Sequence, residues 1–234
     1  MSARTSYVAT APARRSSPVF STWATALLLP LGPAAVAVLR LVLPYYTAGS
    51  PEETVAEVGR HPGAQSAVLW LGLVAVLTLV PGVIAAAGIC RAAAPRLTSW
   101  ALALAVPGYL ALAVMLGADQ LLWSAHQAGL SASQSAALFS AAHPTVGIAT
   151  GIFVVGHVVG TVLLGIALVR SGRVPAWAGW ATAVSQPLHF VATVFLGSPQ
   201  VDFVGWSLTA VGMAMVAREL LRSDSSTEPV TPRP

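Results

Sequence analysis

The sequence predicts an all-α integral membrane protein whose chain crosses the bilayer six times. Of its 234 residues, 56% are hydrophobic and only 9% are charged, whereas a soluble domain carries roughly 25% charged residues. Six apolar runs alternate with short polar segments, and arginines gather in every second segment. So few charged side chains cannot cover a surface that faces water on all sides, so the apolar excess must face lipid.

The six apolar runs lie between two polar tails. They extend over 19–43, 65–90, 97–117, 144–169, 174–196 and 201–217. The last is the shortest, near the lower limit of the about 17–25 residues that a helical span needs. Arg14 and Arg15 precede the first run as in a signal peptide, but the length of that run favours an uncleaved span. Residues 1–17 and 223–234 are expected to be disordered tails around a membrane domain of residues 18–222.

Arginine placement predicts the orientation of the spans. With the N-terminus inside, every inner segment carries at least two arginines, the outer loops hold only Arg60, and Arg40 lies just within the outer end of the first span. The inner arginines are Arg4, Arg14, Arg15, Arg91, Arg96, Arg170, Arg173, Arg218, Arg222 and Arg233. Cytoplasmic loops are enriched in Lys and Arg. Both termini are therefore predicted to be cytoplasmic, in a multi-pass protein of the cell membrane.

The net charge of +4 does not indicate a nucleic-acid partner. The chain has no lysine, and its twelve arginines are dispersed in ones and twos and form no basic face. The predicted partner is the lipid bilayer. Arginine without lysine, together with abundant alanine, glycine and proline, suggests a GC-rich coding sequence and a bacterial origin.

Two short helices are predicted on the outer surface. Ser50 precedes a proline at the first helical position and Glu53 at the third, which is the capping-box pattern. This pattern predicts a helix over 51–59. Ser131 and Gln134 repeat the pattern before a second short apolar segment. The inner loops are too short for more than turns.

Ionisable side chains at membrane depth are the first candidates for function, because they are costly to bury there. His157 lies near the middle of the fourth span, and His189 lies within the fifth with Gln186 one turn earlier on the same face. Both histidines are roughly 20 Å from the cytoplasmic boundary at 1.5 Å rise per residue, on helices joined by a short turn, so their rings can meet. Such a pair could ligate haem b, bind a transition metal or pass a proton. Alternatively, each neutral imidazole holds helices together through a hydrogen bond to a carbonyl or hydroxyl.

A second polar group is expected near the outer boundary. It contains Arg40, Asp119 and Asp202, with His143 and His126 in or near the adjoining loop. Arg40 is close enough to the boundary to snorkel, and it could also pair with either aspartate. Ion pairing is favoured over ligand binding here. If the protein has a binding pocket, its mouth is expected at this level, under the two short helices.

Prolines and tryptophans within the spans are expected in any membrane protein. The prolines are Pro30, Pro33, Pro81, Pro107 and Pro187. Each one frees a backbone carbonyl, a device that transporters use to coordinate substrates, although simple kinks are more common. The tryptophans near predicted span ends, where aromatic belts form, are Trp100, Trp123, Trp177, Trp180 and Trp206.

Glycines in the fourth span predict close helix contact. Gly147 and Gly151 are four residues apart, as are Gly156 and Gly160. This spacing lets helix backbones approach. The contact is expected either inside the bundle or with another subunit, as a homo-oligomer or with a membrane partner.

Several short motifs are similar to those of a known group of proteins. They are Leu31-Gly32-Pro33, Leu43-Pro44-Tyr45, Gly156-His157 with Gly160, Arg170-Ser171-Gly172 before Val174-Pro175, and Gly205-Trp206. Over about residues 23–221 the chain resembles the small, uncharacterised multi-pass membrane proteins of actinobacteria. The resemblance supports the membrane fold and carries over no established activity.

Two functions from different classes are therefore kept. The chain has no H-E-x-x-H, G-x-S-x-G or Walker motif. The favoured function is non-enzymatic, through helix packing with a partner or binding of a small ligand. The alternative is a membrane haem or metal protein, or a small carrier, that uses His157 and His189.

Overall fold

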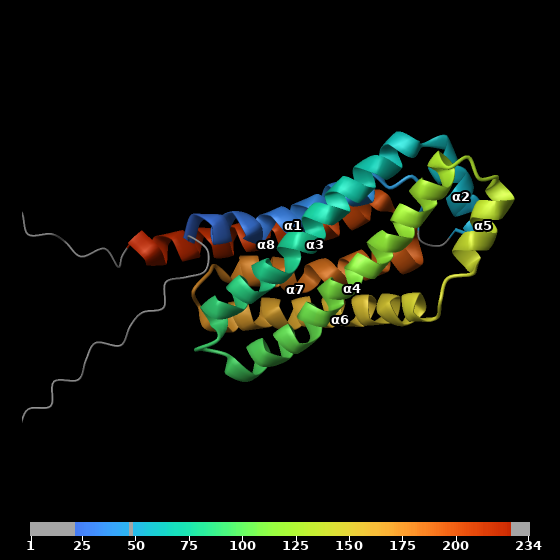
Figure 1. Cartoon of the computed structure of the whole chain (residues 1–234). Coiled ribbons are helices and arrows are strands. Elements are labelled where there is room, and N and C mark those ends of the chain that lie inside the picture. The colour runs from blue at the N-terminus through green and yellow to red at the C-terminus, as the bar shows by residue number, and fades with distance from the viewer. Residues whose placement is uncertain (1–21, 47–48, 226–234) are drawn as a thin grey trace, which may run out of the picture.

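The computed structural model describes residues 22–46 and 49–225, and these residues form helices joined by short turns (Figure 1). The helices are α1 (Thr22–Val42), α2 (Pro51–Arg60), α3 (Pro62–Cys90), α4 (Pro95–Gln127), α5 (Ala132–Ser140), α6 (Thr145–Ser171), α7 (Ala176–Val191), the π-helical turn η1 (Ala192–Leu196) and α8 (Pro199–Ser225). Five of them, α1, α3, α4, α6 and α8, are long enough and apolar enough to cross a membrane. The all-helical, multi-pass class is confirmed at this level.

The segment predicted as the fifth span is helical but changes its pitch. α7 has 16 residues and continues directly into η1, which has five. Gly197 ends this segment in the left-handed conformation, with φ of 58°. α7 alone is slightly shorter than the about 17–25 residues of a span. π-helical turns are frequent at functional sites, and this one directly follows the turn that carries His189.

The long helices form a closed ring. In chain order α1, α3, α4, α6, α7 and α8, each packs against the next, and α8 packs back against α1. Their axes run side by side in Figure 1, with α2 and α5 together at one end of the bundle. The start of α1 and the end of α8 lie at the opposite end. The described chain therefore enters and leaves the bundle at the same end.

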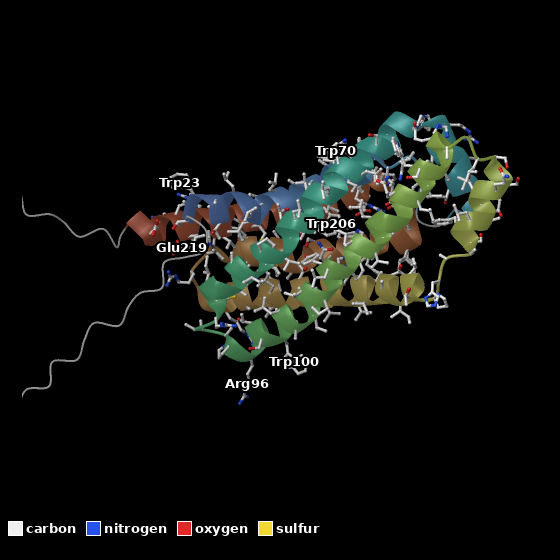
Figure 2. The ribbon with its side chains drawn as sticks, in the orientation of Figure 1. Trp23, Trp70, Arg96, Trp100, Trp206 and Glu219 are labelled. Atoms are coloured by element: carbon white, nitrogen blue, oxygen red, sulfur yellow. The ribbon has the colours of Figure 1, made fainter. Side chains whose placement is uncertain are left out.

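Side chains are distributed in the reverse of the soluble pattern. Trp23, Trp70 and Trp100 are 69%, 70% and 65% exposed and project away from the bundle (Figure 2). His157 and Asp202 are fully buried. Large apolar side chains on the outside with ionisable groups inside are stable when the outside faces lipid.

Both predicted short helices are present with their capping boxes. Glu53 N donates to Ser50 Oγ (3.2 Å) and Ser50 N donates to Glu53 Oε2 (2.9 Å). Ser131 and Gln134 exchange the same two bonds. α2 and α5 pack on each other and over Leu122 of α4 through a small apolar cluster. This cluster covers one end of the bundle.

The predicted end of the third span is wrong. α4 continues to Gln127 rather than ending at Gly117, because Leu122 and Ala125 are buried beneath α2 and α5. His126, expected in or near a loop, lies in the last turn of α4, next to the loop that follows.

α8 is also longer than predicted. It extends over Pro199–Ser225 rather than 201–217, so the sixth apolar run is not a short helix. Its last turns are held by Arg173, whose Nε donates to Glu219 Oε1 at 3.4 Å. α8 thus includes the first residues of the expected tail 223–234, whose remainder, like the tail 1–17, lies outside the described residues.

Four of the five glycines of α6 form two pairs. A Cβ on Gly156 would lie 2.6 Å from the α4 backbone, and one on Gly160 would lie 2.5 Å from it. This pair serves the α4–α6 contact within the chain. A Cβ on Gly147 or Gly151 would meet nothing within 4 Å. Only this second pair is open to a partner.

Candidate functional site

Asp202 joins members of the two polar groups predicted from the sequence. Arg40, in the last turn of α1, makes an ion pair through Nε with Asp202 Oδ2. His189 Nδ1 lies 2.5 Å from Asp202 Oδ1. Asp202 was expected in the outer group with Arg40 and Asp119. In the structure it joins Arg40 to His189.

Asp202 is fully buried and surrounded by donors. Beyond Arg40 and His189, the hydroxyls of Thr193 and Tyr46 lie 3.3 and 3.4 Å from Oδ2. Asp202 also lies in the first turn of α8, where the helix dipole favours a negative charge. The structure thus offers a buried carboxylate the partners that it needs to remain ionised.

Hydrogen bonds determine the tautomer of both histidines. A carboxylate only accepts, so Nδ1 of His189 donates to Asp202, and in the neutral ring its Nε2 carries a lone pair. Trp206 Nε1 lies 3.2 Å from the same Nδ1, and it contacts the protonated nitrogen without a second hydrogen bond. His157 Nδ1 donates to the Phe153 carbonyl at 2.5 Å, so its Nε2 is also an acceptor. That atom is buried and has no hydrogen-bond partner among the described residues.

The two histidine rings meet, as their equal depth predicts. Their centroids are 5.3 Å apart. His157 is stacked between Phe153 at 4.1 Å and Trp206 at 5.8 Å. Trp206 lies inside the bundle (Figure 2) and is 1% exposed, so its expected place in an aromatic belt is wrong. Only His189 links two helices by a hydrogen bond, because the Nδ1 bond of His157 stays within α6.

This arrangement does not fit haem b. Phe153 and Trp206 cover both faces of His157. The adjoining cavity measures about 100 Å³, well below the ~300–1,000 Å³ of pockets for drug-sized ligands. Across residues 22–46 and 49–225, no group of three or more His, Cys, Asp or Glu side chains is placed to hold a metal ion. We therefore carry neither the haem nor the metal alternative further.

Asp119 of α4 forms a second polar arm. Its Oδ1 accepts from the Tyr45 hydroxyl and from Gln65 Nε2 at 3.2 Å. Burial, and then the Asp119 charge, raises the pKa of Tyr45 well above its ordinary value, so this phenol is a permanent neutral donor. Within the described part of the chain, no Arg or His lies within ion-pair distance of Asp119.

Both arms border the same cavity. Its polar lining consists of Arg40, Tyr45, Asp119, His189 and Trp206. The rest of the wall is apolar and contains Val36, Leu39, Leu43, Gly72, Leu112, Met115, Leu116 and Phe153. The cavity therefore has an ionic side and an apolar side, as a site for a small amphipathic molecule requires.

Two residues predicted for these groups lie elsewhere. His143 is exposed before the start of α6, where Nδ1 lies 3.1 Å from Thr145 Oγ1. Pro144 begins the helix after it, so His143 belongs to the connecting loop and does not reach the cavity. Gln186 shares α7 with His189, but its Nε2 donates to Thr209 at 3.0 Å, further along the bundle.

No family model matches this chain, and no curated protein or solved structure is significantly similar to it. The resemblance to actinobacterial membrane proteins therefore stays an expectation from the sequence. A proposal for the function therefore rests on the geometry of the cavity.

Proposed function

We propose that this protein crosses the cell membrane six times, with both termini in the cytoplasm, and binds a small ligand in the cavity between Arg40, Asp119 and His189. The observation that carries the proposal is the meeting of two separate polar arms at one cavity. The role is binding rather than catalysis. The described lining contains no Ser, Thr or Cys that His189 could activate as a nucleophile.

The ring of helices supports six spans. The α7–η1 segment lies between α6 and α8 and continues to Leu196, where the apolar run ends. Arg96 lies at the end of the bundle opposite α2 and α5 (Figure 2). Since arginine-rich ends face the cytoplasm, this supports an outer position for α2 and α5.

The energetic cost of the network supports a binding role. Each buried ion loses several kcal/mol of hydration, and a well-packed apolar substitute is often as stable or more so. Ionisable groups inside a membrane bundle therefore indicate a functional site by default. The cavity lies where these groups converge.

Ligand binding is tested by thermal unfolding of the detergent-purified protein with three probes of similar size: n-propylammonium, 1-propanol and acetate. A bound probe raises the unfolding free energy by about 1.4 kcal/mol at a concentration ten times its Kd. The control is Met115→Trp, which fills the cavity from a flexible, half-buried position. We expect at least one probe to stabilise the native protein and not the variant. Stabilisation of both alike, or of neither by any probe, would overturn the proposal.

A small carrier is the second candidate, because polar side chains continue beyond the cavity. Thr209 accepts from Gln186 and donates to Ser185 at 2.6 Å. Thr209 also borders a smaller cavity of about 20 Å³, enough for one water molecule. Polar chains of this kind are found in proton relays and transporters. Uptake into proteoliposomes of the probe that binds would favour a carrier, and binding without uptake would exclude it.

A further inference from the structure

We infer that the ligand is a small protonated amine, with its ammonium group at Asp119 and its alkyl part against the apolar wall. This inference rests on the proposed function and specifies the class of ligand. It follows from the charge of the cavity, from its surplus of hydrogen-bond acceptors and from its size.

The charged groups at the cavity are not balanced. Arg40 is the one guanidinium and is paired with Asp202. Asp119 is a second, half-buried carboxyl group at the cavity, and its hydrogen-bond donors are the Tyr45 hydroxyl and the Gln65 amide. The network thus holds two carboxyl groups and one guanidinium, and a monovalent cation would balance a carboxylate at Asp119.

Buried acceptor atoms without a hydrogen-bond partner lie next to residues of the cavity wall. In the described part of the chain they are Gln65 Oε1, beside Asp119, and His157 Nε2, whose ring contacts Phe153 and Trp206. The orientation of the Gln65 amide is determined, because its Nε2 donates to both the backbone oxygen and Oδ1 of Asp119. Its Oε1 therefore accepts. An ammonium group supplies three donors and no acceptor, whereas an anion would add further acceptors.

The cavity favours a short organic cation. A 150 Å³ cavity holds benzene, with six heavy atoms, so a volume of about 100 Å³ corresponds to roughly four. The Leu112, Met115 and Leu116 side chains suit an alkyl chain, and Trp206 adds an aromatic wall, to which cations are attracted. A metal ion has no matching set of ligands among the described residues.

The test compares the three probes of the preceding section with tetramethylammonium, which has the charge of propylammonium but no N–H group. On the native protein we expect propylammonium to bind at least about ten-fold more tightly than tetramethylammonium, because each hydrogen bond between charged groups is strong. Propanol should bind more weakly than propylammonium, and acetate should not bind. Equal binding of both cations, or tighter binding of acetate, would overturn the inference and leave the proposed function intact. Binding of no probe would overturn both.

The variant Asp119→Asn tests whether Asp119 is the group that binds the ammonium ion. It should lose the preference for propylammonium over propanol, and its affinity for propylammonium should fall about ten-fold or more. The matched control is Glu52→Gln, which removes the same charge from an exposed position on α2 and should keep that preference. An unchanged preference in Asp119→Asn would overturn the inference. If that variant does not fold, the comparison of propylammonium with tetramethylammonium decides on the native protein alone.

Discussion

Removing the charge of Asp202 should be the most damaging conservative change in this protein. Asp202→Asn keeps the shape of the side chain and an oxygen for His189, but it leaves Arg40 without its carboxylate. The Arg40 side chain is only 12% exposed, and removing one member of a buried ion pair costs about 3–5 kcal/mol. We expect a loss of that size in the free energy of unfolding.

The double variant Arg40→Met with Asp202→Asn should recover most of this loss, because it removes both charges together. The measurement is a cycle of the two single variants and the double variant, unfolded in a denaturing detergent and followed by circular dichroism. Glu219→Gln is the control: it breaks a pair with Arg173 in which the side chains are 23% and 55% exposed, and should cost below about 1 kcal/mol. A cost for Asp202→Asn no larger than that of the control, or no recovery in the double variant, would refute the reasoning.

Three further predictions concern packing, ligand length and orientation. Gly156→Ala should destabilise the protein by about 1–3 kcal/mol, because its added methyl group overpacks the contact with α4. Gly151→Ala, at an open position, should be neutral or stabilising by about 0.5–1 kcal/mol. Equal effects of the two variants in unfolding titrations would contradict this prediction. Leu116 lines both the ligand cavity and a groove of about 330 Å³ between α3 and α4, so Leu116→Ala should admit hexylammonium as well as propylammonium in the thermal assay, unlike the native protein. In a cysteine-free background, Ser133→Cys on α5 should react with an impermeant maleimide on intact cells, and Ala93→Cys should react only after permeabilisation; the reverse pattern would invert the topology.

The depth of a side chain in the bundle could be predicted from the sequence, but its direction could not. The equal depth of His157 and His189 follows from helix rise and from the short connection between their helices, and their rings do meet. Asp202 was placed at the outer boundary because it begins an apolar run. Its helix, α8, begins at Pro199, and the Asp202 carboxylate points towards His189 of α7. Hydropathy gives the position of a residue along a helix and says little about rotation around it.

The residues that the sequence failed to indicate have the same explanation. Gln65 begins an apolar run, where a polar residue is expected to face the headgroups, yet it is fully buried beside Asp119. Tyr45 follows the end of α1 and folds back to the same carboxylate. Trp206 fits an aromatic belt by position, and only its contact with His157 shows that it lines the core. In each case the inward direction comes from the packing of neighbouring helices.

Different charged groups of this network should determine the stability of the protein and its preference among ligands. The pair of Arg40 with Asp202 has no net charge, and the double variant that removes it leaves the Asp119 carboxyl group at the cavity. That variant should therefore keep its preference for propylammonium over propanol. Asp119→Asn should lose this preference with a smaller effect on folding, because the partners of Asp119 are a neutral hydroxyl and a neutral amide, and neither is left as an unpaired charge. If the double variant lost the preference instead, the amine would be recognised through Asp202, and the role assigned to Asp119 would be wrong.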